Sequence, residues 1–438
     1  MYLSFFYHSD LWWKEPFGLD NGIIPSTFPI QYASQLIELY TDDEKDTLAN
    51  RFLAVADLIE VYSRIVVNLG PHITPNPEQL HVIANTSQNC FAIAVMEILV
   101  RRTEFVDLYL NGGFISSGVK DPSEKKHVLV TMAVYNLMRR VHKGENNVDL
   151  DQLMVAVNLV SDGKFPDGEH QDPSEFMAVL MESLHLSFLD DVYNSNGNPA
   201  TPASNIFRGE QFNKLVCTNP QCGSSNVTKD DMWQIFIMPD ESPDSNDNKR
   251  RGNKSFDVGM CLDRQCEDEQ VECRCARNCG SESKSKTISF IMPRIISLSL
   301  VAQKVSFDST NNTPVKLSKS KWSTPHKLDS RRYLPPPEFT TGRRVTNDKS
   351  VYELVGVINH GSGGDAMQGH YYTHVKIGSQ WYNFNGKRVL KVQPDTASKS
   401  SNMFSLVYCL MNPLPSTATI ATAIGDDAQP TKKIKTTH

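Results

Sequence analysis

Residues 85–100 have the sequence NTSQNCFAIAVMEILV, a polar run that ends in a cysteine followed by an almost wholly apolar segment. The polar residues before Cys90 are types that cap helices, and the segment from Phe91 to Val100 is apolar on nearly every side. We therefore predict a buried helix that begins at or just after Cys90. A thiol at a helix N-terminus lies at the positive end of the helix dipole, which favours the thiolate. A lone cysteine is most often a small buried hydrophobe, but this context makes Cys90 a candidate nucleophile.

A candidate base lies far downstream, where Gly369-His370-Tyr371 leads into a strand-like stretch. A second such stretch follows and ends at Asn385. An imidazole presents the correct tautomer to a thiol when an acceptor holds its other nitrogen. A histidine in a strand is more often structural, but a short hairpin would bring Asn385 beside His370 and make a catalytic role competitive.

Composition limits the classes of protein that need considering. The chain has 438 residues, 39% of them hydrophobic, and a formal net charge of -6, so it has no global basic field that would attract nucleic acid. No apolar run reaches the roughly 18 residues of a membrane span. The first basic residue is Lys14, so residues 1–13 lack the basic start of a secretory signal. We interpret them as an ordinary N-terminal element or the edge of an incomplete gene model. The expected location is intracellular, in cytoplasm and/or nucleus, and the basic run 432–435 hints at nuclear import but is common by chance.

The periodicity changes along the chain from helical to strand-like. Residues 28–70 and 123–190 have helical apolar periods, and short β-rich segments begin near residue 206. This order predicts an α+β fold. The strand-like segments are Trp233 to Met238, Ile288 to Ile291, Ile295 to Val301, Tyr352 to Ile358, Tyr371 to Ile377 and Phe404 to Leu410.

Two polar stretches are predicted to be exposed loops. One is 239–256, and the other is 304–350, where ten Lys or Arg against four Asp or Glu give a local charge of +6. A nucleic-acid role for the second loop is the weakest hypothesis, because charge runs are usually just solvated. The segment 413–438 is expected to be a disordered tail.

Seven of the nine cysteines lie between residues 217 and 279, which suggests metal binding rather than disulfides. Two cysteine knuckles at the ends of an extended hairpin form a structural Zn²⁺ ribbon. A degenerate ribbon with free thiols is an equal alternative, and Cys261 and Cys266 could compete as ligands. The preferred ligand set is Cys217, Cys222, Cys275 and Cys279.

Taken together, several segments of residues 79–412 resemble the ubiquitin-specific protease family. Each motif is weak alone, but their order and spacing are specific. The matching segments are Asn85 to Phe91, Gln171-Asp172-Pro173-Ser174-Glu175-Phe176, Tyr352 to His360, Gly369-His370-Tyr371, Trp381 to Asn385 with Val389, and Ser405 to Tyr408.

The resemblance implies a papain-like α+β fold with a helical lobe, a β lobe and an inserted zinc-ribbon-like fingers hairpin at about 206–300. The helical period of residues 28–70 predicts a helical extension at 1–78 before it. It implies a thiol-dependent hydrolase that cuts the isopeptide or peptide bond after the C-terminal glycine of ubiquitin. We expect no cofactor for catalysis, although the family can carry a structural zinc. The expected partners are ubiquitin or ubiquitinated proteins, and neither a membrane nor nucleic acid is an expected partner.

The same resemblance assigns roles to individual residues. Cys90 would be the nucleophile, His370 the base and Asn385 its orienting partner, and Asn85 would help form the oxyanion hole. The expected ubiquitin-binding residues are Gln171, Asp172, Glu175, Gly369 and Tyr371. Asp172 and Glu175 would contact the basic ubiquitin tail, although both could equally be ordinary carboxylates at a helix N-terminus.

The sequence also departs from the family pattern. Ser87-Gln88-Asn89 replaces the usual Gly-Asn-Thr, and Ile93 stands where asparagine is common. Two alternatives therefore stay open: a catalytically weak or inactive ubiquitin-binding scaffold of the same fold, and a protease for another ubiquitin-like modifier.

Overall fold

An eight-stranded sheet forms the centre of the computed structural model, whose strand order is β15-β14-β13-β12-β17-β7-β3 with β11 paired to β12. The β7–β3 pair is parallel and the other pairs are antiparallel. The strands are β3 (Gln234–Ile237), β7 (Ile295–Leu300), β11 (Lys327–Asp329), β12 (Val351–Ser362), β13 (Gly369–Ile377), β14 (Gln380–Asn385), β15 (Arg388–Val392) and β17 (Met403–Leu410). The structure describes residues 76, 80–111, 125–145, 148–166, 168–187, 201–239, 255–301, 305–307, 314–316, 321–339, 350–362, 369–400 and 402–411.

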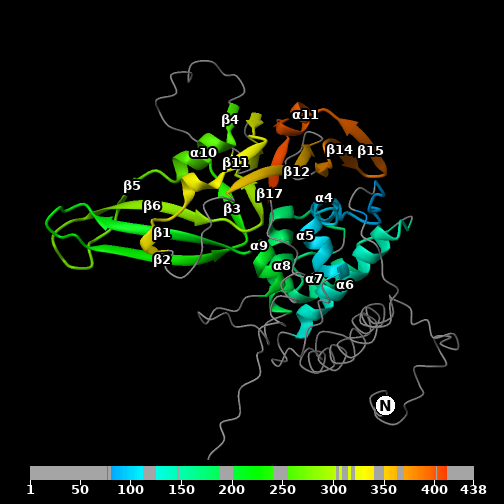
Figure 1. Cartoon of the computed structure of the whole chain (residues 1–438), viewed down its shortest axis with the longest axis horizontal. Helices are drawn as coiled ribbons and strands as arrows, with labels where there is room; N and C mark the ends of the chain where they lie inside the picture. The colour runs from blue at the N-terminus through cyan, green and yellow to red at the C-terminus, as the bar shows by residue number, and fades with distance from the viewer. Residues whose placement is uncertain are drawn as a thin grey trace, which may run out of the picture.

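Helices from the first half of the described chain cover one face of this sheet (Figure 1). They are α4 (Cys90–Leu99), α5 (Thr103–Val106), η3 (Asp107–Asn111), α6 (Lys125–His142), α7 (Asp151–Val160), α8 (Pro173–Leu186) and α9 (Pro202–Phe207). Helix α4 begins at Cys90, where the sequence predicted that a helix would start. None of the described helices has the length and apolar character needed to cross a membrane.

Side-chain alternation along the central strands separates two hydrophobic clusters. On β12, Val355 packs with the helices, whereas Leu354 and Val357 pack in the second cluster. On β17, Val407 faces the helices, and its neighbour Leu406 belongs to the other cluster. Successive strand residues point to opposite faces, so a sheet buried on both faces has near-continuous apolar strands. That is why these segments could be identified as strands from composition.

The second face is covered by α10 (Val258–Gln265) and a small sheet of order β16-β10-β4. Its strands are β4 (Ser255–Asp257), β10 (Lys321–Ser323) and β16 (Lys399–Ser400). The short elements η4 (Ser330–Tyr333) and α11 (Pro394–Ser398) contribute Tyr333 and Ala397 to this layer. In η5 (Pro337–Phe339) the ring of Phe339 lies under Nζ of Lys214, and β8 (Val305–Phe307) pairs with β9 (Pro314–Lys316) separately.

The prediction of one exposed loop over 304–350 is wrong for residues 321–339. Trp322 is only 1% exposed, and Leu328 and Tyr333 are also buried in the second cluster. The charged residues of this segment alternate with these apolar ones, so its local charge hid three core positions. Ser350 at the end of the range is buried as well. The rest of 304–350, most of 239–256, the extension 1–78 apart from residue 76, and the tail 413–438 lie outside the described residues or have no described side chains.

A long antiparallel sheet projects from this body, on the left in Figure 1, with strand order β2-β1-β6-β5. Its strands are β1 (Gly209–Cys217), β2 (Ser225–Met232), β5 (Glu269–Glu272) and β6 (Ser283–Ile291). We call it the fingers. Its strands lie within the range 206–300 predicted for a fingers insertion, but β3, β7 and α10 of the same range belong to the body. The fingers have four strands instead of the two of a single hairpin.

Helix α4, which begins with the candidate nucleophile Cys90, lies between the sheet and the other helices, in contact with β12, β13 and α8. Its approach to β12 depends on Gly356. A Cβ added there would lie 2.6 Å from Cδ1 of Ile98, a separation that real Cβ atoms essentially never show. Glycine at 356 therefore lets the helix pack closely enough to bring Cys90 over β13.

Candidate active site

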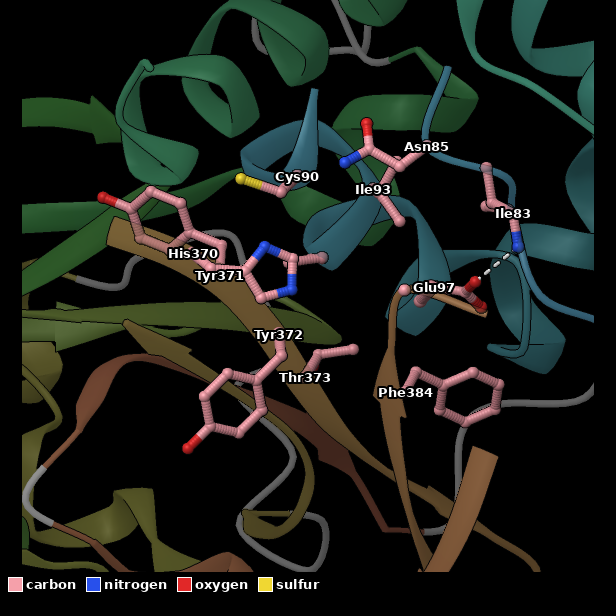
Figure 2. A pocket seen from close by; sticks show the side chains of 12 residues that line it. Ile83, Asn85, Cys90, Ile93, Glu97, His370, Tyr371, Tyr372, Thr373 and Phe384 are labelled. Atoms are coloured by element: carbon pink, nitrogen blue, oxygen red, sulfur yellow. Dashed lines mark hydrogen bonds between the residues drawn. The ribbon is translucent and has the colours of Figure 1, made fainter. Parts of the chain in front are cut away.

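The candidate nucleophile is the first residue of α4. Cys90 is 4% exposed, and its side chain and the imidazole of His370 project into one cleft, together with Asn85 (Figure 2). The cleft has about 320 Å³ of empty space. Further lining residues are Ile83, Ile93, Ala94, Glu97, Tyr371, Tyr372, Thr373, Phe384 and Gly386.

The helix N-terminus was expected to favour the thiolate of Cys90, but the surroundings of the thiol favour its protonated form. Burial raises the pKa of Cys90, and hydrogen bonds from the backbone of Tyr371, Phe91 and Cys90 itself lower that pKa by less. The helix N-terminus therefore contributes in the predicted direction, but desolvation outweighs it. The preceding polar residues do not cap the helix as expected, since Asn89 makes no side-chain capping hydrogen bond.

The candidate base is oriented as the sequence predicted. His370 stands on β13, and its Nε2 lies 2.8 Å from Oδ1 of Asn385 on β14. An amide oxygen can only accept, so Nε2 carries the proton and Nδ1 keeps its lone pair. The neutral imidazole thus has the tautomer needed to accept a proton from a thiol.

The segment that carries Asn85 is fixed on both sides. Ala84 N–H donates to the Val148 carbonyl at 2.6 Å, and the Thr86 hydroxyl donates to Oδ1 of Asp151 at 2.6 Å. Asn85 itself is exposed in the cleft. The backbone N–H groups at the start of α4 have no partner within the helix, so they and the Asn85 carboxamide are donors on the same side of the cleft.

The predicted substrate-binding residues are only partly brought together. Tyr371 lines the cleft, and burial and the charge of Asp172 both raise its pKa, so Asp172 lies nearby. Asp172 caps α8 by accepting from Ser174 N–H at 2.6 Å, as the alternative interpretation expected. Burial raises the pKa of Asp172 itself.

Of the five predicted binding residues, only Tyr371 is among those that line the cleft in the described chain; Asp172, Gln171, Glu175 and Gly369 are not. Glu175 is exposed, and its carboxylate lies 3.3 Å from Nζ of Lys164. Nε2 of Gln171 lies 3.4 Å from Oε2 of Glu169. Gly369 precedes the base and packs under His360, whose Nε2 would lie 1.9 Å from a Cβ at this glycine.

Two features of the site were not foreseen. His360 stacks on Tyr371 with ring centroids 4.5 Å apart, and Glu97 lines the cleft from within α4. The signal for Glu97 was present in the sequence, because it is the only charged residue in an otherwise apolar helix.

At the tip of the fingers the preferred cysteine set comes together. The sulfurs of Cys217, Cys222, Cys275 and Cys279 all lie within 4.8 Å of one another. Cys217 and Cys279 are 3.5 Å apart, as are Cys222 and Cys275. A tetrahedral Zn²⁺ with bonds of about 2.3 Å places sulfurs about 3.8 Å apart, so the four thiols fit this ion. Cys261 and Cys266, the competing candidates, are not in this cluster.

The fold and the cleft define a class: a papain-like α+β protein in which a cysteine on a helix and a histidine on a strand share one cleft, with asparagine behind the histidine. Comparison with known proteins gives the family. The ubiquitin carboxyl-terminal hydrolase family model matches residues 82–411, so the chain belongs to this family.

Curated relatives in this family are distant. The chain is 27% identical over 254 residues to ubiquitin carboxyl-terminal hydrolase 15 of Saccharomyces cerevisiae, covering 56% of this chain and 19% of that protein. It is 23% identical over 289 residues to ubiquitin carboxyl-terminal hydrolase 2 of Gallus gallus, covering 57% and 71%. The chain thus matches only about a fifth of the yeast protein.

Similar solved structures agree on the fold. The SAGA Ubp8/Sgf11/Sus1/Sgf73 DUB module bound to ubiquitin aldehyde contains a chain with a TM-score of 0.56 and 18% identity, covering 84% of this chain and 76% of that one. A chain of the module bound to monoubiquitin gives a TM-score of 0.57 at 17% identity, with the same coverage.

Proposed function

We propose that the chain is a cysteine deubiquitinase that hydrolyses the isopeptide or peptide bond after the C-terminal glycine of ubiquitin. The observation that carries this proposal is the 2.8 Å contact between His370 Nε2 and Asn385 Oδ1, with Cys90 and Asn85 in the same cleft. A bound and oriented imidazole beside a thiol is the arrangement that nucleophilic catalysis needs. Membership of the hydrolase family and the ubiquitin-bound structural neighbours support ubiquitin as the partner.

The reaction follows from the tautomer of His370. Nδ1 accepts the proton of the Cys90 thiol, and the sulfur attacks the carbonyl carbon of the terminal glycine. The resulting oxyanion accepts hydrogen bonds from the Cys90 N–H and the Asn85 carboxamide. His370 returns the proton to the leaving amine, the C–N bond breaks, and a thioester remains. Water, deprotonated by His370, then attacks the thioester and releases ubiquitin and the thiol.

On the substrate side, we propose that the acidic edge at α8 receives the basic tail of ubiquitin. Glu175 is exposed, and its carboxylate forms a surface ion pair with Lys164. Such a pair contributes little to stability, so an incoming arginine of ubiquitin can take the place of Lys164. Asp172 and Tyr371 lie closer to Cys90 and would contact the glycines. Gln171 and Gly369 are assigned to the same channel by the resemblance alone.

We also propose that the fingers hold one structural Zn²⁺ through Cys217, Cys222, Cys275 and Cys279. Backbone hydrogen bonding from Arg277, together with hydrogen bonds from the other three thiols, lowers the pKa of Cys275 to about 6, which favours its thiolate. In Cys222, a backbone hydrogen bond from Ser224 lowers the pKa, but burial and hydrogen bonds to the other three thiols together raise it, so metal binding has to displace the proton of this thiol. When bound, the ion would cross-link the two knuckles and take no part in the reaction. All nine cysteines lie in the described residues as free thiols, in keeping with an intracellular location.

The zinc proposal predicts one equivalent of zinc per chain in purified protein, measured by atomic emission. Cys222→Ser should lose the metal and lower the melting temperature, whereas Cys273→Ser, outside the cluster, should change neither. Equal zinc content in the two variants would contradict the ligand set.

Labelling by full-length ubiquitin with a C-terminal thiol-reactive group tests the enzyme proposal. The wild-type chain should form a covalent adduct, and Cys90→Ala and His370→Ala should not. An adduct that persists in Cys90→Ala would reject this nucleophile.

The altered cysteine box, Ser87-Gln88-Asn89, and the raised pKa of Cys90 favour one second candidate, a ubiquitin-binding scaffold with weak or no activity. Folded wild-type protein that binds ubiquitin but forms no adduct would support that candidate. Protein that does not bind ubiquitin at all, but is labelled by another modifier with a Gly-Gly terminus, would support a different substrate.

A further inference from the structure

A buried ion pair lies at the C-terminal end of α4, the helix that begins with the candidate nucleophile. Glu97 and Arg101 stand one turn apart on and just after α4, and their side chains are 2% and 1% exposed. Removing two charges from water is expensive, and their mutual attraction often fails to compensate for it. A buried pair in an otherwise apolar helix is therefore poorly explained by stability alone.

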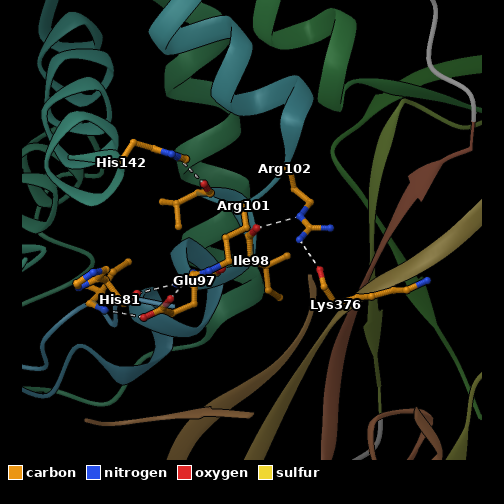
Figure 3. A network of polar contacts seen from close by, with 9 residues as sticks. His81, Glu97, Ile98, Arg101, Arg102, His142 and Lys376 are labelled. Atoms are coloured by element: carbon orange, nitrogen blue, oxygen red, sulfur yellow. Dashed lines mark hydrogen bonds and ion pairs between the residues drawn. The ribbon is translucent and has the colours of Figure 1, made fainter. Parts of the chain in front are cut away.

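Both side chains hold the backbone that leads to Asn85 (Figure 3). Oε1 of Glu97 accepts the N–H of Ile83 at 2.6 Å. Nη2 of Arg101 donates to the His81 carbonyl at 2.7 Å, and its Nη1 donates to the Glu97 carbonyl at 2.6 Å. The pair thus fixes this segment two residues before the Asn85 carboxamide.

The same guanidinium reaches the other half of the site. Arg101 lies over the ring of Phe384 at 4.2 Å from its centroid, and Phe384 is buried on β14. The next residue is Asn385, which holds His370. One ion pair therefore contacts both the segment carrying the oxyanion donor and the strand carrying the partner of the base.

We propose that Glu97 and Arg101 are positioning residues that fix the distance between the Asn85 segment and β14, and so place the oxyanion donor relative to Cys90. This inference rests on the proposed hydrolase function. Glu97 lines the cleft, and its role here is to hold the Ile83 N–H, not to take part in the reaction. The acceptor on Glu97 matters most, because donors stabilise an oxyanion only when held within about 0.5 Å of the required position.

Two double variants isolate that acceptor without leaving a buried charge. Glu97→Gln with Arg101→Met keeps an oxygen for the Ile83 N–H, whereas Glu97→Leu with Arg101→Met removes it at similar volume. Hydrolysis of a C-terminal fluorogenic ubiquitin amide gives kcat and KM, and iodoacetamide alkylation of Cys90 reports the thiol and base without any oxyanion. We expect the Leu-containing double variant to show a kcat about tenfold or more below its partner, with unchanged KM and alkylation rate.

Equal kcat values in the two double variants would overturn the inference, and so would a parallel loss of alkylation, which would indicate general damage. Glu97→Asp is the alternative if either double variant does not fold. It keeps the charge but shortens the reach to Ile83 by one methylene, and it should lower kcat at unchanged KM. Wild-type protein that releases no fluorophore would instead reject the proposed function, so the two failures are distinguishable.

Discussion

At the scale of single residues, the site joins a buried thiol to a base whose orientation is already fixed. Burial raises the pKa of Cys90 above its usual value despite three backbone hydrogen bonds that lower it. The thiolate is therefore scarce near neutral pH unless His370 accepts the proton. The Asn385 contact keeps Nδ1 of His370 available for that transfer.

This balance predicts the pH dependence of Cys90 in His370→Ala. A thiol with a raised pKa stays protonated to higher pH, so its reactivity should rise through a midpoint above the ordinary cysteine value. We expect the iodoacetamide rate of the variant to increase across that alkaline range, and the wild-type rate to be higher than the variant rate near pH 7. A midpoint below the ordinary value in the variant would mean that the helix N-terminus, not the imidazole, activates the thiol.

Cys90, His370 and Asn385 could be predicted because each has a local signal, whereas Asn85 and the expected ubiquitin-binding residues were assigned by the family resemblance. Cys90 opens a helix after a polar run, and His370 and Asn385 occupy the strands of one hairpin. Their packing neighbours could not be predicted in the same way. The contacts of Arg101 with His81 and Phe384 connect segments far apart in the sequence, and no local pattern specifies such contacts.

At the scale of elements, the register between α4 and β12 decides where the thiol lies. Gly356 sits at an irregularity in the β12–β17 pairing and directly under Ile98. The strands here could be predicted from β-rich apolar runs. Nothing in the sequence around Gly356, however, indicates that a helix packs against this glycine. The buried segment 321–339 was missed for a related reason, since its apolar residues are separated by charges.

The close contact between Gly356 and Ile98 predicts that a single methyl group added at residue 356 lowers the free energy of unfolding. In Gly356→Ala the new Cβ would meet three carbons of Ile98, at 2.6 to 2.8 Å. Overpacking of this kind typically costs about 1–3 kcal/mol, which urea unfolding followed by tryptophan fluorescence would measure. Adding Ile98→Val should recover part of the loss, because the two sites are in contact and therefore couple.

Gly361→Ala on the same strand is the matched control. Its Cβ would have ordinary contacts of 3.6 Å, so its free energy of unfolding should change much less. Equal losses in the two glycine variants would show that strand propensity, not contact with α4, sets the cost.

At the scale of the whole molecule, the sheet separates the helices that carry Cys90 from the layer formed by α10 and the small sheet. The range of the fingers came from the family resemblance, and the α+β class could be predicted from the change in periodicity. The number of finger strands could not, because β2 and β5 are mostly exposed and lack the apolar runs that mark buried strands. The polar, exposed residues of β2 and β5, and the shortness of β5, left no strand signal in the sequence.

The arrangement also predicts how ubiquitin should affect the folded chain as a whole. A partner that binds only the native state stabilises it by about 2.7 kcal/mol at a hundredfold excess over Kd. The melting temperature of Cys90→Ala should therefore rise with ubiquitin concentration, because this variant keeps the cleft and the α8 edge proposed to receive the ubiquitin tail but lacks the thiol. Ubiquitin without its last residues cannot fill the cleft, so it should give a smaller shift at the same concentration. Equal shifts would mean that ubiquitin binds away from the cleft, and a scaffold function would then explain the binding better than catalysis at Cys90.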